Sequence, residues 1–238
     1  MSSLKDKVVI VTGAVGNLGH AVAKRVQAQG GKTILVDRSS DRLQKTYGEL
    51  KNSTQHWLAG GIDMTDTKAV NAMTAEAHQR FGRLDGLVNT VGGFRGGKPV
   101  HEADLAEWDF LYDINVRTTL NACRAVIPYM LQAQSGRIIN IASRNAFQGS
   151  PNYAAYSAAK TAVLRLTESL AGELKARGIN VNCIAPGTID TPQNREAMPK
   201  ADFSTWVPPE DLANVIAFLL SDDARSVAGT AVPVYGRS

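Results

Sequence analysis

Cysteine is scarce in this chain of 238 residues, which contains only Cys123 and Cys183. Both cysteines lie in apolar surroundings and neither belongs to a CxxC pair. The sequence therefore predicts neither a disulfide framework nor a metal site. This cysteine usage fits the reducing conditions of the cytoplasm, which is the expected location.

Long hydrophobic runs and a dominant sign of charge are also missing. No uncharged apolar run reaches the roughly 18 residues of a membrane-spanning helix, and the amino-terminal segment lacks the apolar stretch and cleavage site of a secretory signal. Lys and Arg number 26 against 22 Asp and Glu, a net charge of +4, and the basic residues are scattered along the chain. We therefore expect no nucleic-acid partner and no membrane association.

The composition is that of a globular protein, with 44% hydrophobic and 20% charged residues. A chain of this length buries roughly 70–75% of its unfolded surface on folding, which is enough for a substantial core. We found no internal repeat, low-complexity tract or Pro/Ser-rich linker in the sequence. These features predict one large domain that spans residues 1–238.

Apolar, β-branched runs alternate with helix-length segments along the chain. The runs are continuous rather than alternating, as expected for strands that helices cover on both faces. The predicted strands are residues 8–12, 33–36, 84–89, 137–141, 179–184 and 231–234, and the predicted helices include residues 18–29, 105–132, 153–177 and 209–220. This order predicts a doubly wound α/β domain with a parallel sheet of about seven strands. The least regular stretch, residues 187–209, is the predicted mobile lid over a site.

A glycine-rich turn connects the first predicted strand to the first predicted helix. It reads Thr12-Gly13-Ala14-Val15-Gly16-Asn17-Leu18-Gly19. Glycine permits a tight turn and a close approach of the backbone, so that a pyrophosphate can bind at the amino end of the helix. The turn predicts a dinucleotide site, although a tight strand-helix connection without a ligand has the same composition.

Asp37 ends the second predicted strand, eighteen residues after Gly19. A carboxylate at this spacing meets the adenosine ribose hydroxyls and would repel a 2′-phosphate, which favours NAD. Arg38 complicates the prediction, because a guanidinium at this place can hold the phosphate of NADP. In the alternative interpretation, both are turn residues before a helix that Ser39, Ser40 or Asp41 caps.

Tyr156 and Lys160 are four residues apart and therefore share one face of a predicted helix. A phenol with a pKa near its ordinary value of about 10 is a poor acid-base catalyst at neutral pH, and a nearby cation lowers that pKa. The pair predicts a tuned tyrosine, but a surface pair with this spacing also occurs by chance.

In order and spacing, these motifs resemble those of the classical short-chain dehydrogenase/reductase family. The further matching elements are Asn89-Thr90-Val91-Gly92 after the fourth strand, Ser143 after the fifth, Tyr156 and Lys160 thirteen and seventeen residues beyond it, and Pro186-Gly187 after the sixth. The resemblance covers residues 5 to 236. It implies a single Rossmann-type domain and an NAD(P)-dependent oxidoreductase that transfers hydride between nicotinamide and a carbonyl or secondary alcohol carbon.

The resemblance also implies four catalytic residues. Tyr156 is similar to the family's general acid/base, and Ser143 to the residue that holds the substrate oxygen. Lys160 resembles the residue that binds the nicotinamide ribose and lowers the tyrosine pKa. Asn115 resembles the asparagine that holds a water for the proton relay. A loop-capping serine and a satisfied mid-helix amide are the alternatives for Ser143 and Asn115.

The implied dinucleotide site involves the glycine-rich turn and residues that follow the other strands. Asp63 resembles the adenine-contacting aspartate, Asn89 and Gly92 the motif that supports the sheet and lines the adenosine side, and the segment from Pro186 the cover of the nicotinamide. Each can instead be a turn residue. The full implied set is Gly13, Gly16, Asn17, Leu18, Gly19, Asp37, Arg38, Asp63, Met64, Asn89, Val91, Gly92, Tyr156, Lys160, Pro186, Gly187, Ile189 and Thr191.

The chain departs from the family pattern in three places. Asn17 stands where the nucleotide turn usually has its central glycine, with Gly16 one place earlier. Thr90 and Val91 replace an Asn-Ala pair, so the contacts of the second amide are lost and a bulkier side chain meets the cofactor edge. The predicted lid is short for the family, which implies that a large substrate is less fully enclosed.

The substrate is expected to be a small to medium, uncharged and partly apolar carbonyl compound or secondary alcohol. The residues predicted to flank it are Phe94, Arg95, Phe147 and Trp206, whose three aromatic rings would form an apolar wall. Alternatively, these rings are subunit contacts or core residues. Arg95 and Arg144 keep an anionic substrate open, including one on a phosphopantetheine carrier.

Other functions remain open beside the leading one. One is a 3-oxoacyl-acyl-carrier-protein reductase-like enzyme that uses NADPH. Another is a regulator that binds the dinucleotide without turnover, in which Tyr156 or Lys160 would be expected to have changed. An extended-type epimerase or dehydratase would add a carboxy-terminal substrate domain, and none is expected here.

Two long predicted helices, residues 105–132 and 153–177, carry apolar and small side chains on more than one face, including Ala154, Ala158 and Ala162. One sheet cannot cover them entirely, which implies a second burial partner. The family resemblance suggests a homotetramer that is built on these helices.

Overall fold

The computed structural model describes residues 3–237, whose strands form one parallel sheet. The strand order is β3-β2-β1-β4-β5-β6-β7. The strands are β1 (Val8–Thr12), β2 (Lys32–Asp37), β3 (His56–Gly60), β4 (Gly86–Asn89), β5 (Gly136–Ile141), β6 (Ile179–Pro186) and β7 (Ala231–Val234). This sheet confirms the predicted doubly wound α/β fold with about seven strands.

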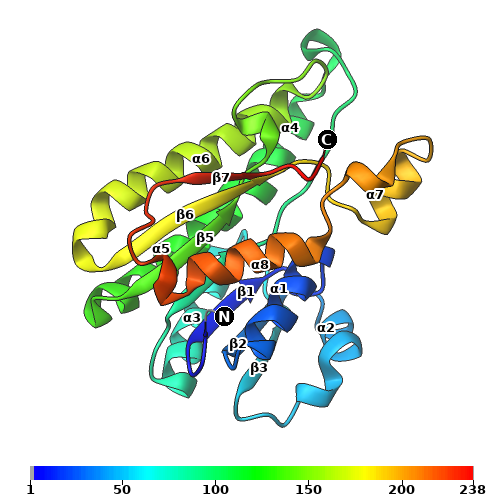
Figure 1. The fold of residues 1–238 in the computed structure, drawn as a ribbon. Helices are drawn as coiled ribbons and strands as arrows, with labels where there is room; N and C mark the ends of the chain where they lie inside the picture. Colours follow the sequence, from blue (N-terminus) through cyan, green and yellow to red (C-terminus); the bar gives the residue numbers. More distant parts are fainter. Residues whose placement is uncertain (1–2, 238) are drawn as a thin grey trace.

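Helices cover both faces of the sheet (Figure 1). The helices are α1 (Asn17–Ala28), α2 (Ser40–Tyr47), α3 (Thr67–Phe81), α4 (Leu105–Tyr112), α5 (Thr118–Ala133), α6 (Ala154–Leu174), α7 (Pro192–Ala197) and α8 (Pro209–Leu220). Apolar side chains of α1, α2 and α8 form one core cluster with the sheet, and those of α3, α5 and α6 form the other. The central strands are therefore buried from both sides, which explains their continuous apolar runs.

The predicted helix over residues 105–132 is interrupted. After α4, the segment Asp113–Arg117 forms a π-helical turn before α5 begins at Thr118. Such turns often occur at functional positions, and this one contains Asn115. The prediction of a single regular helix was wrong at this point.

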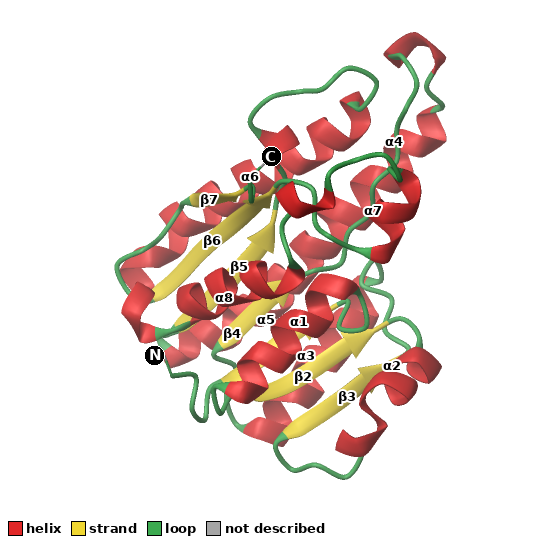
Figure 2. Ribbon diagram, turned by 45° about the vertical axis from the view of Figure 1, so that its right-hand side comes forward, coloured by secondary structure: helices red, strands yellow, loops and turns green. Residues whose placement is uncertain are grey.

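The order of the strands places a crevice at one end of the sheet. β1 pairs with β2 on one side and with β4 on the other. The connection after β1 leads to one side of the sheet and the connection after β4 to the other, so the strand order reverses between β1 and β4. In open parallel sheets, ligands bind beyond the carboxyl ends of the strands at such a point. The strands point toward the end of the molecule where α7 lies (Figure 2).

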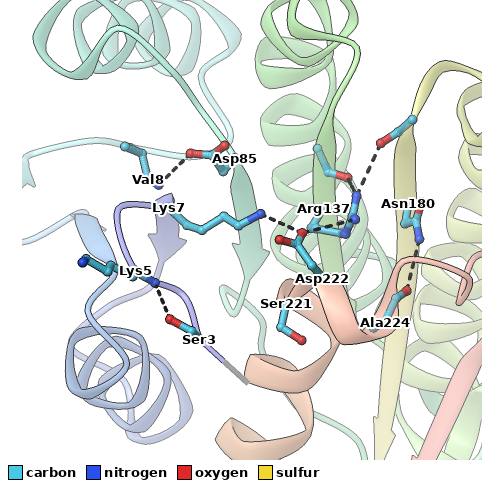
Figure 3. Close-up of polar contacts among 12 residues, drawn as sticks. Ser3, Lys5, Lys7, Val8, Asp85, Arg137, Asn180, Ser221, Asp222 and Ala224 are labelled. Atoms are coloured by element: carbon cyan, nitrogen blue, oxygen red, sulfur yellow. Dashed lines mark hydrogen bonds and ion pairs between the residues drawn. The ribbon is translucent and has the colours of Figure 1, made fainter. Parts of the chain in front are cut away.

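The opposite, amino-terminal edge of the sheet is closed by polar contacts (Figure 3). Asp222 accepts a hydrogen bond of 2.8 Å from Lys7 Nζ and lies 3.8 Å from the guanidinium of Arg137. The amide of Val8 donates a 2.8 Å hydrogen bond to Asp85 Oδ2. These contacts tie the entries of β1, β4 and β5 together and leave the carboxyl edge for the site.

Candidate active site

The glycine-rich turn after β1 has a backbone that larger residues would not permit. Gly13 adopts φ +63°, in the left-handed region that favours glycine. A Cβ atom on Gly19 would collide with the Gly13 carbonyl oxygen. Glycine at these two positions keeps the turn tight and open toward the crevice, as the dinucleotide prediction requires.

The first turn of α1 has free backbone donors. Its N-cap residue Gly16 supplies no side-chain hydrogen bond, whereas Ser39 caps α2 and Asp66 caps α3. Uncapped N–H groups at the positive end of a helix dipole attract an anion. Together with the glycine turn, this end of α1 fits the pyrophosphate of a dinucleotide.

Side chains of other elements hold the backbone of this turn, and the sequence analysis did not single out two of them, Tyr47 and His20. Tyr47, which is buried, donates a 2.8 Å hydrogen bond from its hydroxyl to the Ala14 carbonyl oxygen, and His20 Nδ1 lies 2.9 Å from the same hydroxyl. The Thr90 hydroxyl donates to the Thr12 carbonyl oxygen, and the Thr90 amide donates to Thr12 Oγ1 at 3.2 Å. Thr90 therefore replaces the lost amide contacts with contacts of its own, made with the nucleotide turn.

Asp37 and Arg38 lie at the carboxyl end of β2, beside the turn. Asp37 Oδ1 accepts a 3.0 Å hydrogen bond from the Ser39 amide, and Arg38 is exposed. Asp63 accepts hydrogen bonds from the amide and hydroxyl of Thr65, which lower its pKa, and the positive charge of Arg38 lowers it further. Carboxylates and one guanidinium thus gather at the proposed adenosine end.

Asn89 supports the sheet. Its side chain is buried and donates a 2.9 Å hydrogen bond to Asn140 Oδ1, which links β4 to β5. Val91 packs against the core on the α3, α5 and α6 side. Leu18 and Met64, also in the predicted cofactor set, are buried and pack in the two core clusters.

Ser143, Tyr156 and Lys160 come together at the ends of β5 and α6. A hydrogen bond with the Ser143 side chain lowers the pKa of Tyr156, although burial has the larger effect and raises it. Lys160 Nζ lies 5.9 Å from the centre of the Tyr156 ring and donates a 2.9 Å hydrogen bond to the Ile141 carbonyl oxygen. The lowering of the tyrosine pKa by Lys160 stays a prediction.

Lys160 is a buried cation. Loss of solvation on burial lowers its pKa from 10.5 to about 8, and the nearby Cys183 thiol partly opposes this change. A lysine with a pKa near neutrality can exchange a proton under ordinary conditions. The Lys160 side chain lies one helical turn from Tyr156 on the same helix.

Asn115 lies opposite Lys160, across Gly92. Its side-chain amide donates hydrogen bonds of 3.0 Å to the carbonyl oxygens of Gly93 and Leu111, and its oxygen accepts one of 3.2 Å from the Gly93 amide. A Cβ atom on Gly92 would lie 3.0 Å from Asn115 Oδ1 and 3.4 Å from Lys160 Nζ. A side chain at Gly92 would therefore crowd both polar groups.

The predicted lid is held together by its own contacts. Arg195 pairs with Asp190 through two hydrogen bonds of 2.6 and 2.7 Å, and its guanidinium lies over the Phe203 ring. Thr191 caps α7 by accepting a hydrogen bond from the Asn194 amide. Ile189 forms a parallel bridge with Val207, and Pro186 ends β6 beside Gly187.

The predicted substrate residues differ in their surroundings. Phe94 and Phe147 are exposed, whereas Trp206 is buried and packs against Phe203. The guanidinium of Arg95 lies 3.7 Å from the centre of the Phe110 ring. Arg144 follows Ser143 and lies over the Tyr235 ring, 4.4 Å from its centre. Trp206 therefore belongs to the packing of the lid, and Phe94 and Phe147 keep faces for a ligand.

Two further features concern residues 3–237, the part of the chain that the structure describes. This part of the chain contains no group of three or more His, Cys, Asp or Glu side chains that is arranged to hold a metal ion. None of its helices has the length and apolarity to cross a membrane.

Comparisons with known proteins agree with the geometry. The family model described as short chain dehydrogenase matches residues 7–202. The chain is 34% identical to 2-(S)-hydroxypropyl-CoM dehydrogenase 3 of Xanthobacter autotrophicus, with 98% of this chain and 96% of that protein covered. It is 33% identical to the (2S)-[(R)-hydroxy(phenyl)methyl]succinyl-CoA dehydrogenase subunit BbsD of Thauera aromatica, with 98% and 96% covered. The crystal structure of levodione reductase superposes with a TM-score of 0.89 at 34% identity, with 98% of this chain and 97% of that one covered.

Proposed function

The chain belongs to the short-chain dehydrogenase/reductase family of oxidoreductases that act on alcohol or carbonyl substrates, and from this premise we propose that Tyr156 is its general acid/base. The bound nicotinamide supplies or accepts the hydride. The chain supplies the position of the substrate and the path of the proton. The observation that carries this proposal is the convergence of Ser143, Tyr156 and Lys160 at one end of the sheet.

The proton path follows from the contacts of these side chains. In the direction of reduction, Tyr156 donates its phenolic proton to the substrate oxygen, which Ser143 holds. Lys160, with its pKa of about 8, returns a proton toward Tyr156. Lys160 Nζ and Asn115 Oδ1 both lie close to Gly92, and a water molecule that bridges them would connect the relay to Asn115. In oxidation the same groups act in reverse.

Removal of one oxygen atom tests this role. Tyr156→Phe keeps the ring and its packing but deletes the proton path, so turnover should fall by about 10²- to 10⁴-fold while the Kd of the cofactor stays nearly unchanged. Tyr129→Phe on α5 is the matched control, because that ring stacks on His78 away from the site. A Tyr156→Phe variant that kept more than half of the wild-type rate would contradict the proposal.

We further propose NAD as the preferred cofactor, with NADP as the alternative, because Asp37 lies at the end of β2 where the adenosine ribose would bind. We also propose a homotetramer and a cytoplasmic location. Exposed Leu105 and Tyr112 on α4 and exposed Ala158 on α6 support the first, and two free, buried cysteines support the second. A panel of carbonyl and alcohol substrates, measured with both cofactors, tests the reaction class.

A further inference from the structure

An aromatic ring of the loop after β4 lies directly against the proposed catalytic tyrosine. The centre of the Phe94 ring is 4.9 Å from that of Tyr156, and the two planes meet edge to face at 83°. On its other side Phe94 stacks on Tyr153, with ring centres 5.2 Å apart and planes inclined by 28°. Phe94 nevertheless stays 61% exposed, the largest exposed fraction among the aromatic side chains of residues 3–237.

Hydrogen bonds hold the backbone on both sides of Phe94. Before it, Gly93 exchanges hydrogen bonds with the Asn115 side chain at 3.2 and 3.0 Å. After it, the Gly97 amide donates a 2.8 Å hydrogen bond to the Asn152 carbonyl oxygen. The exposed ring is therefore not the tip of a loose loop, because the same segment that carries it binds to Asn115 and to the start of α6.

The next two residues add to this arrangement. Gly96 has φ +155°, and a Cβ atom there would collide with the Tyr153 ring, so only glycine lets the loop approach α6 this closely. The Arg95 guanidinium lies over the Phe110 ring, 3.7 Å from its centre, and this cation–π contact occupies its charge. The exposed face that remains is apolar, planar and next to the phenol that would protonate the substrate.

We infer that Phe94, supported by Tyr153, is the binding face for a planar ring of the substrate, and that the substrate class is an aryl ketone or the corresponding aryl secondary alcohol. The inference rests on the proposed function of Tyr156. A carbonyl oxygen within hydrogen-bond reach of Tyr156 brings the substituent on the carbonyl carbon close to Phe94. An aromatic substituent can stack there and cover an apolar face that is otherwise in water.

The reaction at this substrate is balanced by the groups already named. In reduction, hydride from the reduced nicotinamide adds to the carbonyl carbon, and Tyr156 donates a proton to the oxygen. The products are the aryl secondary alcohol and the oxidised nicotinamide. The Phe94 face takes no part in the bond changes. Phe94 is therefore a specificity-determining residue, because it binds the ring of the substrate that the reaction does not change.

A matched pair of ketones tests the inference. Acetophenone and cyclohexyl methyl ketone have the same carbon count but differ in the planarity of the ring, and 1-phenylethanol and 1-cyclohexylethanol form the equivalent pair for oxidation. The quantity to measure is the ratio of kcat/KM for the aryl compound to kcat/KM for the cyclohexyl compound. The difference in intrinsic reactivity between the two compounds is the same for every variant, so it cancels when this ratio is compared between variants. We expect Phe94→Ala and Phe94→Leu to lower this ratio by about two- to tenfold, and Phe94→Tyr to preserve it.

Phe218→Ala is the control, since Phe218 on α8 is also exposed but lies on another element, and it should leave the ratio unchanged. A ratio within twofold of wild type in Phe94→Ala, or full retention in Phe94→Leu, would overturn the inference while turnover of either ketone still upheld the proposed function. Equal losses on both ketones together with a changed mass by light scattering would also overturn it, because Phe94 would then belong to a subunit contact. No turnover of either compound with either cofactor would overturn the inference, while turnover of another carbonyl or alcohol in the substrate panel would still uphold the proposed function.

Discussion

The side-chain amide of Asn17 donates a 2.9 Å hydrogen bond to Oε1 of Gln193, 176 residues further along the chain. Asn17 is the first residue of α1, at the nucleotide turn, and Gln193 lies in α7, within the lid. The family pattern has glycine at this position, and a glycine has no side chain that could make such a contact. In this chain Asn17 therefore links the nucleotide turn to the lid, and the cofactor would bind between these two segments.

This contact predicts slower release of the cofactor. A net hydrogen bond contributes about 0.5–1.5 kcal/mol, so Asn17→Ala and Gln193→Ala should each speed NADH dissociation about two- to tenfold in stopped-flow fluorescence. The double variant should dissociate no faster than the faster single one, because both changes remove the same contact. Glu196→Ala, on the same helix, is the control. Fully additive effects of the two substitutions would refute the coupling.

Part of the fold was predictable because its signals are local. β1 is buried along its whole length and is an apolar run up to Thr12, which makes it easy to recognise. β6 is also buried throughout, although it includes Asn180 and Asn182, whose amides donate hydrogen bonds to the Val227 carbonyl oxygen. β3 is an edge strand with a single fully buried residue, Ala59, and no such run marks it. The π-helical turn at Asn115 likewise has no local signal, since it accompanies side-chain contacts with Gly93, a residue of another segment.

The same distinction applies to the site. Tyr156 and Lys160 could be predicted because they are four positions apart on one helix, and the glycines because a tight turn requires them. Tyr47 and Gln193 were missed, since each meets the nucleotide turn only through the tertiary fold. Nothing in the local sequence around Tyr47 indicates that its hydroxyl will donate a hydrogen bond to the Ala14 carbonyl oxygen.

Asp37 should decide the cofactor preference. Its carboxylate would accept hydrogen bonds from the ribose diol of NAD but would repel a 2′-phosphate by about 1–4 kcal/mol, or roughly 5- to 1000-fold in affinity. We expect NAD to be preferred by at least about fivefold in kcat/KM, and Asp37→Ala to shift the preference toward NADP. Asp41→Ala, on α2, should leave it unchanged. A wild-type enzyme that favoured NADP would show that Arg38 dominates.

A second copy of the chain should cover α4 and α6. Leu105 and Tyr112 on α4 are 77% and 51% exposed, and Ala158 on α6 is exposed. Apolar faces of this kind are normally buried in an interface. Light scattering at micromolar concentration should give four times the mass of the 25.5 kDa chain, and Ala158→Glu should reduce it. A single 25.5 kDa species of the unmodified protein would contradict the tetramer.

Lys160 should make the stability of the cofactor-free protein depend on pH. Its pKa is about 8 in the folded protein against 10.5 ordinarily, so between these values the unfolded chain holds a proton that the folded protein has released. The free energy of unfolding therefore rises with pH in this window, by up to about 3 kcal/mol relative to Lys160→Met, which does not titrate. Urea denaturation of both proteins from pH 7 to pH 10 measures this difference, and Lys175→Met, at an exposed position, provides the baseline. If the difference between wild type and Lys160→Met stayed constant over this range, the buried lysine would keep its proton in the folded protein, and its part in the proton path would be lost with it.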